Sequence, residues 1–434
     1  MTVQQKIGLY VVVFIAAFAA VFIMDSITPE YETEFFTGET DVVLPFQGDQ
    51  SDYVKLAEDF GISDGDVLGP FAYRIIPGVI AAAIAAVTNS HVVDGYHIMT
   101  FIGLGLQLVM CFVVAREVGA NIWQSFFVML IVALSLGNVR SMTYDYIRPD
   151  AVAFPWMLGV IWLILRGKLH TAMILSWVGV IAREYFLIPA GIISVYHLWQ
   201  AYEIFRDTEN NQALWKPLIF AVLSSLGAIV VFWIPRMLIS VPDTYQFIET
   251  TDQGGLWDGL LFTIQSGGRN KNYIMAFAGY MFPTALLFSI FRWKNILPDL
   301  KRVFAIVFLY SAGIMLLSYI GGLDFLRFTA YMVVPQVILL AVFLKNGVFW
   351  WELVYLVFMW GWYNRVHQAI TPLQENMREY IIFISPWGMS VPIEVSNHFK
   401  LAVLFIVILW AVRFAWYAYQ KWFQPQKAIA ISTE

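Results

Sequence analysis

Acidic and basic side chains gather in four short polar segments of an otherwise apolar chain. The first segment, FQGDQSDYVKLAEDF (46–60), carries Asp49 and Asp52 three residues apart. A carboxylate so placed can act as a general base toward a hydroxyl group. We expect a loop leading into a helix, with Asp49 or Ser51 near the N-cap. The residues predicted to face inward are Val54, Leu56, Ala57 and Phe60. The simpler alternative is helix capping with a solvated acidic face.

A second polar segment, GNVRSMTYDYIRPDA (137–151), separates two apolar runs. It holds two bases and two acids, namely Arg140, Asp145, Arg148 and Asp150. Pro149 is suited to the first position of the helix that follows. Either these groups line a site or they form local ion pairs in an interface loop.

The third segment, VIAREYFLIPAG (180–191), places Arg183 and Glu184 between two short apolar runs. Ionised groups within a membrane-spanning region cost free energy, and they usually line the interior of a helix bundle or a cavity. The alternative is a self-neutralising structural pair at the end of a tight helical hairpin.

The fourth segment, GLDFLRFTAYMVVP (322–335), places Arg327 at the start of another apolar run. This arginine either faces the same site as the other charges or extends its side chain to the membrane interface.

The composition predicts the elements that must position these groups. The chain has 434 residues, 59% hydrophobic and only 13% charged, with a mean hydropathy of +0.68. A soluble domain of this size carries nearly twice as much charge. The net charge of −5 gives no sign of nucleic-acid binding, and the single Cys111 excludes an internal disulfide framework.

Long apolar runs recur along the chain, and the first, 7–24, is long enough to be an uncleaved first span. Further runs that reach or approach the length of a span lie at 96–115, 122–137, 151–165, 170–182, 185–199, 217–239, 273–290, 303–320, 328–344, 348–362 and 400–420. We therefore expect an all-α polytopic membrane protein with about twelve transmembrane helices.

The apolar run 75–87 decides the topology. It has about 13 residues, roughly 20 Å as a helix, and Pro77 interrupts its start. If it does not cross, the short Lys- and Arg-rich loops all fall on one side, as the positive-inside rule requires. The run is therefore predicted to be an interfacial or re-entrant helix on the outer side, and both termini are predicted to be cytoplasmic.

This topology gives one integral membrane domain over 1–434, with a large outer loop at 25–95 and a second at 363–399. Up to residue 73, the first loop holds about a dozen Asp and Glu against a single Lys55. All four polar segments open to the outer side. Arginines there can hold a phosphate by forked hydrogen bonds, and a carboxylate can act as base on a hydroxyl. The combination fits a reaction on a lipid-linked phosphate.

The layout resembles the GT-C superfamily of polyprenyl-phosphate-sugar-dependent glycosyltransferases. Bacterial multi-pass members show a D…Y…A…YR..P progression, which is similar here to Asp52-Tyr53, Ala57, Tyr73-Arg74 and Pro77. YDYIRPD, AREYFLIP and FLRF…VVP resemble further short elements of that superfamily, and the similarity in layout covers most of 1–345.

The resemblance implies a catalytic base in the first outer loop, at Asp52 or Asp49, with Asp25 as a third candidate. It implies that Arg183 and Arg327 hold the lipid phosphate of a polyprenyl-phosphate-linked sugar donor. Further substrate contacts would come from Arg74, Asp145, Arg148, Asp150 and Glu184. The implied location is a bacterial cytoplasmic membrane.

No metal site is predicted, although the oligosaccharide-transferring branch of the superfamily binds a divalent cation at such carboxylates.

The chain departs from some members in lacking a recognisable C-terminal soluble domain, and 363–399 matches no familiar element. A non-catalytic subunit that docks membrane-protein partners is the main alternative. A secondary transporter is disfavoured, because the chain shows no internal pairing of two halves.

Overall fold

The structure is a computed structural model of the whole chain. The residues it describes are 2–26, 47–62, 67, 71–134, 139–144, 146–207, 211–241, 293–320, 330–345, 407–408, 411–412 and 414–419. The predicted runs at 273–290 and 348–362, most of 400–420, and the second outer loop all lie outside these ranges.

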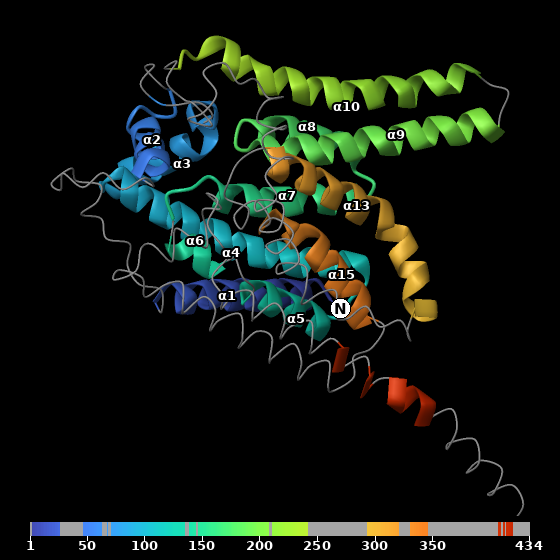
Figure 1. Ribbon diagram of the computed structural model, residues 1–434. Coiled ribbons are helices and arrows are strands. Elements are labelled where there is room, and N and C mark those ends of the chain that lie inside the picture. The colour runs from blue at the N-terminus through green and yellow to red at the C-terminus, as the bar shows by residue number, and fades with distance from the viewer. Residues whose placement is uncertain are drawn as a thin grey trace, which may run out of the picture.

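All regular secondary structure in the described ranges is helical, as the composition predicted (Figure 1). The helices are α1 (Val3–Ser26), α2 (Gln47–Glu58), α3 (Ile75–Thr88), α4 (Val92–Val118), α5 (Ile122–Ala133), α6 (Val139–Tyr144), α7 (Asp150–Leu165), α8 (Leu169–Val180), α9 (Leu187–Asp207), α10 (Asn211–Leu238), α13 (Trp293–Ile320) and α15 (Val333–Lys345). Three 3-10 turns are η2 (Phe71–Tyr73), η3 (Glu184–Phe186) and η5 (Ala330–Met332).

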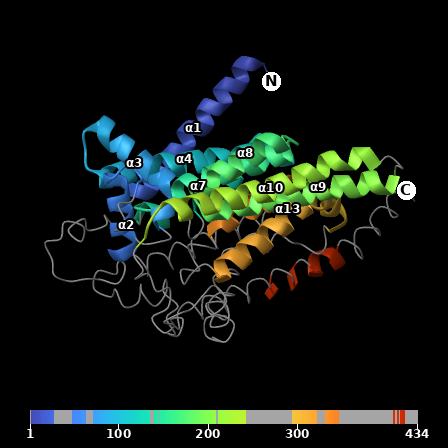
Figure 2. The same cartoon turned by 90° about the horizontal axis from the view of Figure 1, so that it is seen from above.

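The helices form a bundle in which α4, α7 and α15 are central and α1, α9 and α10 lie outside (Figures 1 and 2). Nearly every residue of α15 is buried, whereas α1 and α10 bury about a fifth of their most apolar windows, 22% each. The exposed faces of α1 and α10 carry large apolar side chains such as Phe22, Val222 and Trp233. Such faces need a non-aqueous cover, which a lipid bilayer supplies.

Three helices in the described part of the chain are long and apolar enough to cross a membrane. They are Val3–Ser26, Val92–Val118 and Gln212–Leu238. Several further apolar helices are shorter, among them α7, α8 and α15. The protein is therefore a helical membrane protein, and its full number of spans stays a prediction.

Helix α3 is one of the short apolar helices, with 14 residues and a length of about 21 Å. The hydrocarbon core of a bilayer is about 30 Å thick, so α3 is too short to cross it upright. It packs with α2 at one end of the bundle, against the beginning of α4 (Figure 1). Asn89, in the left-handed conformation, ends α3 and lets the chain reverse into α4.

The helix predicted within 46–60 is α2, and it begins a few residues earlier than predicted. Helix α2 begins at Gln47, so Asp49 and Ser51 lie inside the helix and not at its cap. The inward face is also shifted: Leu56 and Ala57 are buried as predicted, but Phe60 is 56% exposed. Phe60 has a positive φ of 50°, because the chain leaves the helix there and the side chain turns away from the core.

Close contacts between helices depend on glycine. Gly103 of α4 packs so tightly on α7 that a Cβ added there would lie 2.4 Å from the carbonyl oxygen of Ala151. That contact fixes the start of α7, where Asp150 stands. At Gly191 of α9, by contrast, an added Cβ would meet nothing within 4 Å.

We expect Gly103→Ala to destabilise the protein by about 1–3 kcal/mol, because backbone must move to admit the methyl group. The control Gly191→Ala should be neutral or should stabilise by about 0.5–1 kcal/mol through helix propensity. Thermal unfolding in detergent measures both. Equal effects of the two substitutions would contradict the close approach of α4 and α7.

Candidate functional site

An ion pair between Arg74 and Glu184 joins segments 110 residues apart. The Arg74 Nε lies 3.1 Å from Oε1 and 3.2 Å from Oε2 of Glu184. Arg74 precedes α3, and Glu184 begins the turn η3 between α8 and α9. The pair therefore ties the α3 end of the bundle to the α8–α9 hairpin.

Tyr53 attaches helix α2 to this pair. The Tyr53 hydroxyl accepts a hydrogen bond from Nη1 of Arg74. Its backbone carbonyl accepts another from the hydroxyl of Tyr96 in α4, at 2.9 Å. Tyr53 is completely buried, and the adjacent Asp52 is 5% exposed. The acidic helix is thus anchored beside a guanidinium group, and Asp52 is not part of a solvated acidic face.

Arg236, near the end of α10, supplies a second cation to Glu184. Its Nη2 lies 3.7 Å from Oε1 of Glu184. The guanidinium stacks over the rings of Tyr73, at 4.5 Å, and Phe232, at 3.6 Å. Sequence reasoning missed Arg236, although an arginine within an apolar run is the signal that singled out Arg183.

A second ion pair lies deeper in the bundle. The Arg183 Nε is 3.2 Å from Oδ1 of Asp150, and the two side chains are 1% and 0% exposed. The Tyr331 hydroxyl donates a 2.6 Å hydrogen bond to the same oxygen of Asp150. Rings of Phe154 and Tyr185 pack on Tyr331, at 4.8 Å and 4.5 Å. This pair links α7, η3 and η5.

The charges in these two ion pairs keep one another ionised. Three guanidinium groups, on Arg74, Arg183 and Arg236, face two carboxylates, on Glu184 and Asp150, so the five charges carry an excess of +1. Burial opposes the ionisation of Glu184, but Arg74 and Arg183 outweigh it and lower the carboxyl pKa to about 2. Glu184 is therefore ionised at neutral pH. The two partly exposed members are Glu184 and Arg236, with side chains 22% and 17% exposed.

Asp25, the third candidate base, lies at the last turn of α1. Its Oδ1 is 3.2 Å from Nε2 of His97 in α4, and the ring of His97 stacks on Tyr146 at 4.8 Å. The Asp25 side chain is 26% exposed.

The remaining predicted residues are described in part. Arg148 is 9% exposed and lies just before α7. The backbone of Asp49 belongs to α2, but the structure does not describe its side chain. Asp145 and Arg327 lie outside the described residues. Within the described ranges, no group of three or more His, Cys, Asp or Glu residues is arranged to hold a metal ion.

The structure therefore brings Arg74 and Glu184 together, and Arg183 and Asp150, with Asp52 next to the residue that binds Arg74. A comparison of the chain with protein-family models, curated proteins and solved structures finds no match.

The buried pair gives a stability prediction. Arg183→Met leaves Asp150 buried without its counter-charge and should cost about 3–5 kcal/mol. The double variant Arg183→Met/Asp150→Asn removes both charges and should recover more than half of that loss. As a control, Arg166→Met breaks a pair with Glu117 whose side chains are 50% and 28% exposed, and it should cost under about 1 kcal/mol.

Thermal unfolding of the purified variants in one detergent measures these differences. A stable Arg183→Met protein, or a double variant no better than the single one, would show that the pair does not hold the bundle together.

Proposed function

We propose that the protein is a GT-C-type membrane glycosyltransferase. It moves a sugar from a polyprenyl-phosphate donor to an acceptor hydroxyl at the extracytoplasmic face of a bacterial cytoplasmic membrane. The observation that supports this most is the chain of contacts from helix α2 through Tyr53 to Arg74 and Glu184. It ties the helix that carries Asp52 to the Arg74–Glu184 cluster, which consists of Arg74, Arg183, Arg236, Glu184 and Asp150.

The chemistry requires one base and a phosphate site. Asp52 takes the proton of the acceptor hydroxyl, whose oxygen attacks the anomeric carbon of the donor sugar. The bond from that carbon to the phosphate oxygen breaks, and polyprenyl phosphate leaves with the electron pair. A phosphate is already a good leaving group, so no second carboxylic acid is needed, in contrast to ordinary glycoside hydrolysis. A single in-line attack inverts the anomeric configuration.

The phosphate is assigned to the partly exposed end of the cluster. Arg236 and Arg74 share Glu184, and the excess positive charge there attracts the negative charge of the donor. Arg183 is buried against Asp150, so we assign this pair to holding η3 and α7 in place. Arg327, Asp145 and Arg148 remain predicted contacts to the donor or acceptor.

The proposal includes a membrane topology for the bundle, with about twelve spans, both termini in the cytoplasm and the Arg74–Glu184 cluster on the opposite side. In support, Arg74 and Glu184 adjoin the starts of α3 and η3, at the end of the bundle where α1 finishes and α4 begins (Figure 1). Arg116, Arg166 and Lys345 lie at the far ends of α4, α7 and α15. There the ends of α4 and α7 meet, with the Arg166 Nε 3.6 Å from Glu117. Lys345 at the end of α15 bonds Asp299 at 2.8 Å. Basic residues at one end agree with the positive-inside rule.

Sidedness is tested with single cysteines. In a Cys111→Ala background, S90C lies in the exposed turn between α3 and α4, and K168C lies in the exposed turn between α7 and α8. A membrane-impermeant maleimide should label S90C in intact cells and K168C only after permeabilisation. The reverse pattern would put the Arg74–Glu184 cluster in the cytosol, where the proposed reaction has no place.

Asp52→Asn tests the chemistry. It should lower sugar transfer by about 10²–10⁴-fold, the usual contribution of a general base. The assay supplies membranes with polyprenyl-phosphate-linked monosaccharides and measures labelled glycan. Asp59→Asn is the matched control, because Asp59 is exposed in the turn after α2. If Asp52→Asn, Asp49→Asn and the double variant fold normally and change no glycan, the enzyme proposal is wrong and the non-catalytic subunit is favoured.

A further inference from the structure

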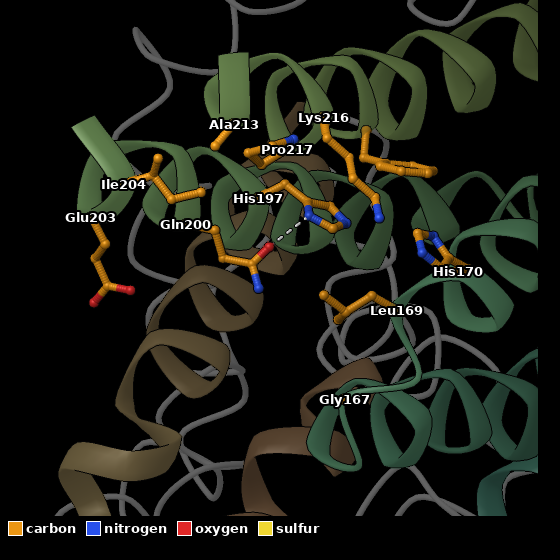
Figure 3. A pocket seen from close by; sticks show the side chains of 11 residues that line it. Gly167, Leu169, His170, His197, Gln200, Glu203, Ile204, Ala213, Lys216 and Pro217 are labelled. Atoms are coloured by element: carbon orange, nitrogen blue, oxygen red, sulfur yellow. Dashed lines mark hydrogen bonds between the residues drawn. The ribbon is translucent and has the colours of Figure 1, made fainter. Parts of the chain in front are cut away.

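A cavity of about 560 Å³ opens at the end of the bundle opposite the Arg74–Glu184 cluster (Figure 1), and Figure 3 shows its lining. The start of α8, the second half of α9 and the start of α10 form its walls. Its polar lining consists of His170, His197, Gln200, Glu203 and Lys216. The role proposed for the Arg74–Glu184 cluster uses none of these residues.

His197 is the buried centre of the cavity, with a side chain 6% exposed. Its Nδ1 lies 3.0 Å from Oε1 of Gln200, so Nδ1 carries the hydrogen when the amide oxygen accepts. Nε2 is then a lone-pair acceptor. It is buried and has no hydrogen-bond partner among the described residues. Leaving such an atom unsatisfied costs about 1–3 kcal/mol, which a ligand that donates a hydrogen bond would recover.

The free nitrogen of His197 points into the cavity on the side of Lys216 (Figure 3). Phe220 stacks on the ring of His197, with centroids 5.5 Å apart, and lies tilted against the ring of His170 at 4.3 Å. The ring orientation is therefore set by packing before any ligand arrives. A donor that enters the cavity meets a preorganised acceptor.

Lys216 makes this part of the cavity cationic. Its ammonium group has no ion-pair partner in the described part of the chain, and it extends toward the two histidines (Figure 3). Glu203 is the acidic residue of the lining, but its carboxylate accepts a 2.9 Å hydrogen bond from Nε1 of Trp199 and points away from the histidines. The inner wall thus offers one positive charge and one hydrogen-bond acceptor, side by side.

The surroundings of the cavity match the depth of lipid headgroups. Trp199, Tyr202 and Trp215 on the outer faces of α9 and α10 are 58%, 51% and 65% exposed. Exposed Trp and Tyr gather where a bilayer meets water. The rest of the cavity wall, which includes Leu169 and Pro217, is apolar.

We propose that this cavity binds the headgroup of an anionic phosphoglycerol lipid. The phosphate pairs with Lys216, a headgroup hydroxyl donates to Nε2 of His197, and the acyl chains follow the apolar sides of α9 and α10. A phosphate without a hydroxyl satisfies only the lysine, and a neutral headgroup hydroxyl satisfies only the histidine. With the proposed topology, the lipid belongs to the cytoplasmic leaflet.

The test uses the purified, delipidated full chain in nanodiscs of phosphatidylcholine, with phosphatidylglycerol added stepwise. Native mass spectrometry counts bound lipid, and thermal unfolding reports stabilisation. The wild-type protein should retain phosphatidylglycerol and unfold at a higher temperature as it is added. Lys216→Gln and His197→Phe should each weaken binding about tenfold, a loss of about 1.4 kcal/mol. Lys168→Gln, an exposed lysine beside but not lining the cavity, should bind as wild type.

Three results would overturn the proposal. They are equal retention of phosphatidylcholine and phosphatidylglycerol, equal weakening by Lys216→Gln and Lys168→Gln, and no weakening by any variant. Binding of soluble glycerol 3-phosphate as tight as that of the lipid would keep the phosphoglycerol chemistry but overturn the lipid as its source. Because Lys216 is exposed, its variant should keep the fold and suffices if His197→Phe does not fold.

Discussion

A charge removed from water inside an apolar bundle must meet an opposite charge, and the rest of the structure depends on this constraint. Arg183 and Asp150 are almost wholly buried, so each requires the other, and Tyr331 adds a hydrogen bond to the same carboxylate. Arg74 and Glu184 form a second pair nearer the surface. Since Arg183 and Glu184 are sequence neighbours, the turn η3 is held from two sides at once, and with it the relative positions of α2, α3, α7 and η5.

The same constraint bears on the role that we propose for this end of the bundle. Among the five charges of the cluster, three guanidinium groups face two carboxylates. The partly exposed Arg236 and Glu184 are the members that an incoming anion would meet. The deeper pair, Arg183 and Asp150, holds them in a fixed position, because moving that pair would separate buried charges. Helix α2 is attached to the cluster through Tyr53, so its acidic residues share that rigidity.

The two ends of the bundle differ in how their polar groups are satisfied. At the Arg74–Glu184 end, side chains from distant segments satisfy one another across helices. At the α8–α10 end, the buried Nε2 of His197 faces a cavity without a hydrogen-bond partner in the described ranges, beside the exposed Lys216. Burial of a polar atom without a partner is unfavourable, so such an atom marks where a second molecule would add stability. The membrane itself is the nearest source of such a molecule.

The sequence by itself determined the helical class and several helix boundaries, such as both ends of α7 and of α8, because apolar runs act over a few neighbouring residues. The hairpin of α8 and α9 around Arg183 and Glu184 was predictable in this way. Only the tertiary structure decided which charges pair. Arg74 pairs with Glu184 although the two residues are 110 positions apart, and Arg236 of α10 also pairs with Glu184. Sequence reasoning missed Arg236 because it lies within an apolar run. Phe60 was assigned to the wrong face for a related reason, since its exposure depends on where the chain leaves α2. Pairing depends on the packing of side chains between helices, which local pattern does not encode.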